Sequence, residues 1–177
     1  MSPRASSPLT VEFILLGLLI EKPAHGYDLH QRLTRLPGLS EIWQVKQAMM
    51  YAMLDKLESA DLISPRVVST GSLISRREYT VTPEGRAAFD VWRRLPVDHP
   101  RELRQEFLAR LYYSHLAGEA AARSLCQAQL INCRQWLAEL PVDDQPEGSF
   151  TRMLIEYRRH TIQAAITWLE QITVGQD

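Results

Sequence analysis

The stretch WQVKQAMMYAMLDKLESADLISPRVVSTGSLISRREYTV, residues 43–81, decides the fold that we expect for this chain. Apolar side chains recur at helical spacing in its first half, so residues 46–60 are predicted to form a helix with one buried face. Two β-like runs follow, residues 62–69 and 74–81, and the turn Thr70-Gly71-Ser72 joins them into a hairpin. A helix followed by a small hairpin is the outline of a winged helix-turn-helix.

Two helices before this stretch and one after it complete the predicted domain. The first begins after Thr10, a suitable N-cap, and ends before Pro23, which cannot continue a helix. The second runs from about residue 26 to residue 36 and is expected to turn Tyr27 inward. The last spans residues 83–94 and starts with a proline behind a capping threonine. The fold class is therefore mainly α with a small β-hairpin.

A break in the helical pattern divides the chain into domains. Two prolines and an aspartate interrupt the pattern between residues 95 and 100, so we place the boundary there. We expect a disordered leader over residues 1–8, an N-terminal winged helix-turn-helix domain over residues 9–95, and a C-terminal helical domain over residues 100–173. Within the last of these, the periodicity predicts helices over residues 101–116, 118–140 and 150–172.

The C-terminal helices carry more apolar surface than three short helices can bury by themselves. Aromatic side chains, among them Trp136, Tyr157 and Trp168, lie on their apolar stripes. Large exposed apolar patches usually mark an interface, so we expect a homodimer built on this domain in preference to a bundle within one chain. The residues predicted to form the dimer interface are Phe107, Leu111, Trp136, Leu154, Tyr157 and Trp168.

Composition and charge place the chain among soluble globular proteins, with the cytoplasm as the expected location. Hydrophobic residues make up 45%, charged residues 23%, and the net charge is −1, so no overall positive field indicates nucleic acid. The apolar run over residues 11–20 is too short for a bilayer, which takes about 20 residues, and the N-terminus shows no signal peptide. Cys126 and Cys133 would lie about 10 Å apart along a helix, too far for a disulfide, so we expect buried thiols.

Signatures of catalysis are missing from the sequence. It contains no nucleophile elbow, no dinucleotide-binding glycine motif and no phosphate-binding loop. His25 and His30 lack the spacing of a zinc-binding pair, and the carboxylates of Asp143, Asp144 and Glu147 have no partner base. We therefore expect a protein that is not an enzyme and that uses no metal ion and no cofactor.

Groups able to contact DNA gather in the opening stretch instead. The first turn of a recognition helix contacts bases, and here it presents Lys46, which can reach guanine or phosphate, and Gln47, which can pair with adenine. Tyr51, one turn later, can donate its hydroxyl to a phosphate. The hairpin brings Arg76 and Arg77 toward a flanking minor groove or its backbone. The predicted DNA-contacting residues of this stretch are Lys46, Gln47, Tyr51, Lys56, Ser72, Arg76 and Arg77.

Several motifs resemble those of the PadR family of bacterial transcriptional regulators. They are Leu15-Leu16-Gly17-Leu18-Leu19, Pro23-Ala24-His25-Gly26-Tyr27-Asp28-Leu29, Tyr51-Ala52-Met53-Leu54-Asp55-Lys56-Leu57-Glu58 with Leu62-Ile63, and Arg77-Glu78-Tyr79-Thr80-Val81-Thr82-Pro83-Glu84-Gly85. The resemblance covers about residues 11–90 and implies a DNA-binding winged helix. It implies that Tyr27, at the start of the second helix, lies close to the DNA and that Tyr51 belongs to the recognition helix.

The resemblance extends beyond the winged helix. Residues 101–112 are similar to the helical extension of the longer PadR subgroup, which implies that the C-terminal domain is the dimerisation domain. The first turn of the recognition helix, residues 46–49, departs from the small residues common in the family.

These observations predict a homodimeric transcriptional repressor that reads a palindromic operator in double-stranded DNA. Release by a small-molecule effector is a further hypothesis. Trp92, Tyr112, Tyr113 and Trp168 could line such a site, although aromatic residues at helical spacing are more often core. The alternative is a winged-helix module that binds another protein without binding DNA, which the weak net charge fits.

Overall fold

The computed structural model describes residues 11–69, 75–141 and 148–174 of the 177-residue chain. The chain divides into two compact units, residues 1–93 and residues 94–177. The predicted leader over residues 1–8, the predicted cap Thr10 and the predicted DNA contact Ser72 lie outside the described residues. No helix among the described residues is long and apolar enough to cross a membrane.

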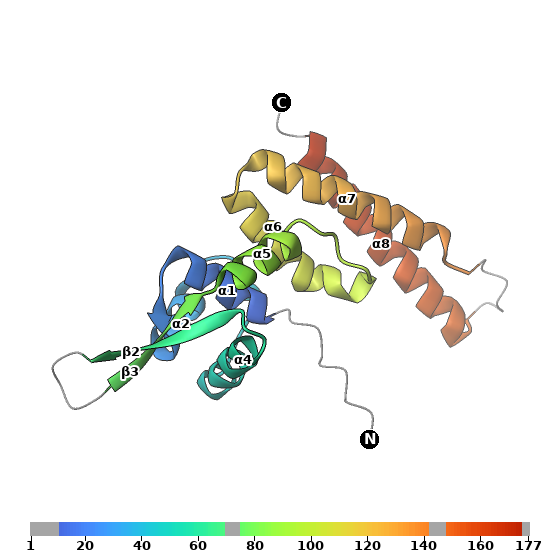
Figure 1. The fold of residues 1–177 in the computed structure, drawn as a ribbon. Helices are drawn as coiled ribbons and strands as arrows, with labels where there is room; N and C mark the ends of the chain where they lie inside the picture. The colour runs from blue at the N-terminus through green and yellow to red at the C-terminus, as the bar shows by residue number, and fades with distance from the viewer. Residues whose placement is uncertain (1–10, 70–74, 142–147, 175–177) are drawn as a thin grey trace, which may run out of the picture. The chain divides into compact units, whose positions relative to one another are not determined.

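The first unit combines helices with a small sheet, which confirms the predicted fold class (Figure 1). The sequence missed two of its elements, because segments of two and four residues are too short to show a period. The helix predicted to reach residue 94 ends at Trp92. The elements are α1 (Val11–Glu21), β1 (Ala24–His25), α2 (Gly26–Arg35), α3 (Leu39–Ile42), α4 (Gln47–Ser59), β2 (Ile63–Ser69), β3 (Ser75–Val81) and α5 (Pro83–Trp92), of which β1 and α3 were missed.

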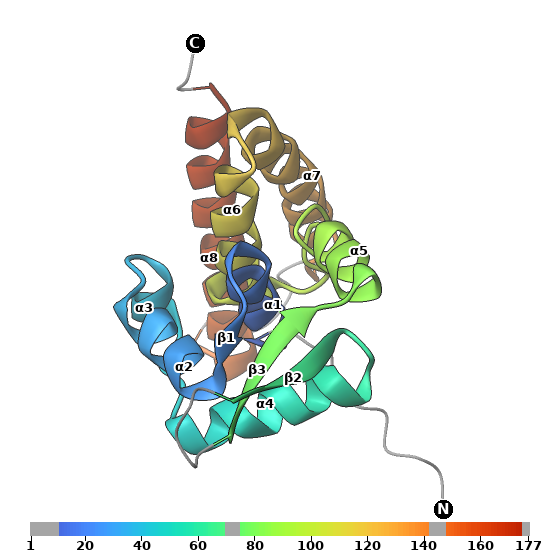
Figure 2. The ribbon, with the colours of Figure 1, turned by 60° about the vertical axis from the view of Figure 1, so that its left-hand side comes forward.

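The sheet has the strand order β1-β3-β2, with both pairings antiparallel and β3 in the middle (Figure 2). The strands β2 and β3, seven residues each, form the wing. Strand β1 adds only the pairs Ala24–Tyr79 and His25–Glu78. Because α2 follows β1 directly, this short pairing fixes the start of α2 against the wing.

Helix α1 forms the centre of the first unit. Leu15, Leu16 and Leu18 have no exposed surface, so this helix is buried on nearly every side. Phe13 stacks on Trp92 of α5, with ring centroids 5.2 Å apart and planes 8° from parallel. Trp92 is therefore a core residue of the first unit, which removes it from the effector site that the sequence suggested.

The chain enters α5 through a turn in which one position accepts only glycine. Asp61 adopts the left-handed conformation expected after a helix, with a φ of 57°. The Thr82 hydroxyl donates to the Asp61 carbonyl at 2.8 Å and accepts from the Gly85 N–H at 3.0 Å, which confirms Thr82 as the cap of α5. A Cβ at Gly85 would stand 2.0 Å from the Leu62 carbonyl oxygen, so a larger residue would collide with backbone.

The described part of the second unit contains helices and no strand. Its elements are the 3₁₀-helix η1 (Pro100–Arg104), α6 (Glu106–Leu116), α7 (Glu119–Ala138) and α8 (Phe150–Val174). The single helix predicted over residues 101–116 is wrong. A capping box between His99 and Glu102 closes η1 as a separate turn, and Gln105 leaves the helical region with a φ of −128°.

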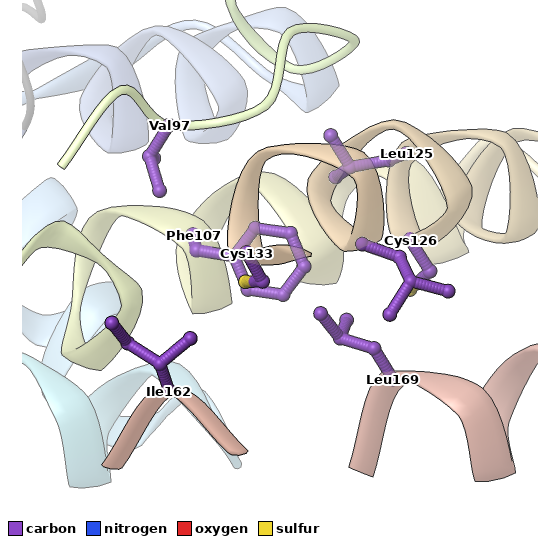
Figure 3. Packing of buried hydrophobic residues seen from close by; sticks show 8 residues of the cluster. Val97, Phe107, Leu125, Cys126, Cys133, Ile162 and Leu169 are labelled. Atoms are coloured by element: carbon purple, nitrogen blue, oxygen red, sulfur yellow. The ribbon is translucent and has the colours of Figure 1, made fainter. Parts of the chain in front are cut away.

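The core of the second unit lies where α6, α7 and α8 meet (Figure 3). Phe107 is fully buried there, and its ring meets Trp168 edge-on at 6.2 Å. Cys126 and Cys133 are free and fully buried, which confirms the predicted thiols. Burial raises the pKa of the Cys126 thiol to about 11. Tyr113, suggested by the sequence as an effector contact, is also buried.

Side-chain hydrogen bonds fasten the first residues of the second unit to its helices. The Gln129 side chain, fully buried, accepts the Val97 N–H at 2.7 Å and donates to the Val97 carbonyl at 3.4 Å. Asn132 donates to the same carbonyl at 3.1 Å. Arg110 donates to the carbonyls of Leu95 and Pro96 at 2.7 and 3.0 Å. The segment over residues 95–97 belongs to no helix, and side chains of α6 and α7 supply hydrogen-bond partners for its backbone.

Candidate nucleic-acid interface

Helix α4 separates its residues sharply into two faces. Met50, Met53, Leu54 and Leu57 are buried, which confirms the core face predicted from their spacing. The opposite face is exposed from the start of the helix to its last turn. The exposed positions are Lys46, Gln47, Ala48, Met49, Tyr51, Ala52, Asp55 and Ser59.

The N-terminus of α4 is open to an anion. Lys46 is the N-cap residue, has an extended backbone and makes no side-chain cap, and the first turn of the helix contains no acidic residue. His30 of α2 donates from Nε2 to the Val45 carbonyl at 2.8 Å and so holds the segment before the helix. Backbone N–H groups at a helix N-terminus attract phosphate, and the Lys46 ammonium adds a positive charge.

Tyr51 packs against Gly26, the first residue of α2. A Cβ at Gly26 would lie 2.8 Å from Tyr51 Cε1 and 3.1 Å from Leu54 Cδ1, so glycine permits the close approach of α2 to α4. The Tyr51 side chain nevertheless remains 46% exposed. Its ring is thus held in place on one side while its other side faces solvent.

The predicted inward orientation of Tyr27 is wrong, and its predicted contact with DNA stays a prediction. It does not turn inward, since 52% of its surface is exposed and the buried residues of α2 are Gly26, Leu29 and Leu33. Its hydroxyl accepts a hydrogen bond from Gln31, one turn along the helix, at 2.8 Å. The exposed position leaves Tyr27 accessible for the DNA contact that the family resemblance implies.

Arg77 ties the wing to the end of α4. Its Nη2 donates to both carboxylate oxygens of Glu58, at 2.8 and 3.0 Å, and its guanidinium lies 5.6 Å from the centroid of the Tyr79 ring. The Arg77 carbonyl accepts from His25 Nδ1 at 2.9 Å. Burial raises the pKa of Tyr79, and the Arg77 charge opposes that rise. Arg77 therefore has a structural partner within its own domain.

Lys56 also has a partner inside the first unit. Its ammonium lies 2.9 Å from Glu12 Oε1, and only 12% of the Glu12 side chain is exposed. A carboxylate this deeply buried depends on its cation, so Lys56 joins α4 to α1. The sequence could not indicate this pairing, because the two residues are far apart in the chain.

A hollow of about 750 Å³ opens where the start of α2, the face of α4 and strand β3 come together. It gathers three of the predicted contacts, Tyr27, Tyr51 and Arg77. Lys46 and Gln47 lie on the same helix but outside its lining, and Arg76 lies in β3 opposite Val68. The sequence missed the remaining lining residues, which are His25, Gly26, Asp28, Asp55 and Tyr79. Asp55 could have been found, since it lies one turn after Tyr51.

The predicted dimer residues fall into two groups in the second unit. Phe107 is buried within its own chain, and Leu111 and Trp136 pack partly buried against the same core. Leu154, Tyr157 and Trp168 of α8 are 44%, 67% and 38% exposed. The buried stripe of α8 runs instead through Ile155, Ile162 and Leu169.

The exposed residues of α8 form a second stripe. Its members follow one another at alternating intervals of four and three residues, the spacing of a helix seam that faces another helix. We call this set the α8 stripe: Phe150, Leu154, Tyr157, Thr161, Ala164 and Trp168.

Helices α2 to α4 followed by a two-stranded wing, with a polar helix face left open, define a winged-helix DNA-binding protein. Residues 15–91 match the model of the transcriptional regulator PadR-like family. The match covers the winged-helix part of the chain, and the predicted resemblance to this family is confirmed. The chain is therefore a DNA-binding regulator of transcription, and its family is not one of enzymes.

Relatives with known roles are distant. The chain is 25% identical over 146 residues to the negative transcriptional regulator PadR of Bacillus subtilis. The aligned region covers 81% of this chain and 75% of that protein. The crystal structure of Bacillus subtilis PadR with operator DNA matches with a TM-score of 0.48 at 21% identity, over 96% of this chain and 100% of that one. The crystal structure of Bacillus subtilis PadR with p-coumaric acid matches with a TM-score of 0.45 at 20% identity, over 94% of this chain and 98% of that one.

Proposed function

We propose that the protein is a homodimeric repressor that reads a palindromic DNA site with one α4 helix from each copy. The observation that carries this proposal is the exposed face of α4, which presents Lys46, Gln47 and Tyr51 beside an uncapped helix N-terminus. A recognition helix uses the residues at its N-terminal end to contact bases.

Each of these three side chains has a separate role in the proposal. Gln47, the first residue of α4, can form two hydrogen bonds with an adenine edge. Lys46 and the neighbouring N–H groups bind phosphate, and Tyr51 donates its hydroxyl to the backbone one turn further on. Tyr27 flanks this face from α2, and Ser72 and Arg76 are assigned to the wing contact. Lys56 and Arg77 act through the ion pairs that shape the surface.

The α8 stripe supports the dimer. It extends over 19 residues, about 27 Å of helix, and carries four large side chains that remain 38–75% exposed. Exposed apolar surface of this length is costly in water, and a second α8 with the same spacing would bury it. A two-fold dimer places two recognition helices on half-sites about 34 Å apart, or a multiple of that distance.

Repression follows from occupancy of a promoter, and the Bacillus subtilis relative is named as a negative regulator. We place this action in the cytoplasm, where the chromosome is accessible. The test is a gel shift with duplexes selected from random DNA, followed by footprinting at several salt concentrations. We expect a protected site with two-fold symmetry and an affinity that falls steeply with salt. If the protein selects no DNA sequence, the DNA-reading role is wrong, and the alternative of a protein-binding module is favoured.

An organic anion is the second candidate partner, and a groove in the second unit favours it. Two adjoining hollows of about 510 and 650 Å³ share the residues His99, Pro100, Arg158 and Ile162. Arg101 and Arg104 add positive charge to the larger hollow, whose described lining contains no carboxylate and includes Tyr157 and Thr161 of the α8 stripe. Asp98 and Glu139 line the smaller hollow, so we assign the anion to the larger one. Asn132 lines the smaller hollow and also holds Val97, which places the anion beside the segment that starts this unit.

Calorimetric titration with p-coumaric acid as the probe tests this site. We expect binding by the wild type and at least tenfold weaker binding by Arg158→Ala. Arg134→Ala is the matched control, because that arginine pairs with Glu170 outside the groove. Equal affinities in the wild type and Arg158→Ala would reject the groove as the effector site.

A further inference from the structure

We propose that Asp55 is a specificity-determining residue of α4, and that the hollow beside it receives the amino group of a cytosine rather than a phosphate. This inference rests on the proposed reading of DNA by α4. It assigns to the middle of the helix a function different from that of Lys46 and Gln47 at its start.

The position of Asp55 suits contact with a base. Gln47, Tyr51 and Asp55 follow one another at intervals of four residues, and all three are exposed. Each interval is about 6 Å and about 40° of helix, so Asp55 lies about 12 Å beyond Gln47 and about 80° around the helix from it, with Tyr51 between them. Stacked bases are about 3.4 Å apart, so a helix lying along a groove would bring Asp55 to a base pair three or four steps from the one that Gln47 contacts.

The Asp55 carboxylate is available. Among the described residues it has no salt-bridge partner, and only its backbone carbonyl is engaged, by the Ser59 hydroxyl at 2.7 Å. Among the described lining residues of the hollow, Arg77 is the one guanidinium, and it is paired with Glu58. DNA that covers this face removes water from the Asp55 carboxylate. Because no cation of the described chain pairs with the carboxylate, a hydrogen-bond donor of the DNA must replace that water.

Charge decides what the hollow can accept. Two carboxylates, Asp28 and Asp55, line it, and the charge of Arg77 is balanced by Glu58 outside the lining. Phosphate would be repelled, since like charges at close range destabilise each other. The major groove offers donors only from the amino groups of cytosine and adenine, and carboxylates characteristically accept from cytosine N4. Guanine and thymine edges at this position present acceptors, which the carboxylate rejects.

Asp55 therefore lowers affinity for wrong sequences more than it raises affinity for the right one. Removing its charge is expected to strengthen binding to unrelated DNA, because phosphate repulsion disappears. The same change is expected to relax the preference for cytosine by about tenfold.

The experiment is selection of binding sites from random duplex DNA with the wild type, Asp55→Ala, Asp55→Asn and Glu119→Ala. Glu119 is an exposed carboxylate of α7, so its variant makes the same charge change in the other unit. We expect Asp55→Ala to lose one cytosine preference per half-site and to leave the other positions unchanged. We expect Asp55→Asn to turn that preference toward adenine, which asparagine can contact through N6 and N7.

Each outcome has a distinct meaning. Loss or conversion of a single position with an unchanged Glu119→Ala motif supports the role of Asp55. Identical motifs for the wild type and both Asp55 variants overturn it while leaving DNA reading by α4 intact. If the wild type enriches no motif, DNA reading itself fails, and the role of Asp55 fails with it. Thermal unfolding of each variant verifies that the exposed substitution leaves the fold unchanged.

Discussion

Helices α4 and α8 resemble each other in outline and differ in what they expose. Each buries one apolar stripe in its own unit, Met50 to Leu57 in α4 and Ile155 to Leu169 in α8. The free face of α4 carries mostly small and polar residues around the single aromatic ring of Tyr51, whereas the free face of α8 is the α8 stripe. A polar face beside an open helix N-terminus suits DNA, and an apolar seam suits a second copy of the chain.

The two units also differ in what holds them together. The first depends on two glycines, Gly26 packed against side chains of α4 and Gly85 against the Leu62 backbone, and on ion pairs that cross between elements. The second depends on an apolar core and on a buried amide, Gln129, which replaces missing backbone partners for Val97. Changes in the first unit should therefore act through backbone geometry and changes in the second through burial. The substitutions below test this difference.

Gly85→Ala is expected to have the largest effect. The added Cβ would meet the Leu62 carbonyl oxygen at 2.0 Å, and the backbone cannot yield without loosening the turn into α5. We expect the free energy of unfolding to fall by more than about 3 kcal/mol, measured by urea denaturation. Gly148→Ala is the control, since it meets nothing within 4 Å and costs only its positive φ, about 1–2 kcal/mol. Equal losses in the two variants would contradict the close-approach explanation.

Replacing Leu154 and Tyr157 together by Asp should disrupt the dimer. Both side chains are exposed members of the α8 stripe, so the substitution spares the core of one chain and places charge in the proposed seam. We expect the dissociation constant to rise at least about a hundredfold, about 2.7 kcal/mol, measured by sedimentation equilibrium. Ile131→Asp, at an exposed position of α7 outside the stripe, should leave the dimer unchanged. A variant that remains dimeric would refute the α8 stripe as the interface.

Gln129→Leu keeps the volume of a buried side chain but leaves the Val97 N–H without its acceptor. An unpaired buried backbone donor costs about 1–3 kcal/mol, so the melting temperature should fall. Gln135→Leu removes a surface bond to Glu139 and serves as the control, with little change expected. If the two variants have the same melting temperature, the segment over residues 95–97 does not depend on Gln129.

Gly26→Ala should have the smallest effect on stability and a visible effect on DNA binding. The new methyl group displaces the Tyr51 ring, which is free to move on its exposed side. We expect the affinity for a selected duplex to fall roughly three- to tenfold at an almost unchanged melting temperature. A loss of stability without a loss of affinity would show that Gly26 serves only the packing of α2.

Periodic and capped segments could be predicted from the sequence because local rules set them. The buried face of α4 and the Thr82 cap follow from spacing and capping chemistry alone. Strand β1 could not be predicted, because two residues become a strand only when β3 lies beside them.

The candidate site was predicted less completely, because tertiary contacts decide which exposed groups are free. The pairing of Arg77 with Glu58 joins residues 19 positions apart, and that of Lys56 with Glu12 spans 44. On α8, both Ile155 to Leu169 and the α8 stripe have helical periodicity, so the sequence cannot choose which one the chain buries. The same ambiguity placed Phe107 at the dimer interface when it belongs to the core.

The measurement that tests the central claim most directly is the DNA affinity of the triple variant Lys46→Ala, Gln47→Ala and Tyr51→Phe. Fluorescence anisotropy on a duplex selected by the wild type, with sedimentation to verify the dimer, gives the answer. Since all three residues are exposed, the variant should fold and assemble normally and bind at least about a hundredfold more weakly, with a shallower dependence on salt. An unchanged affinity in a folded dimer would contradict the reading of DNA by α4.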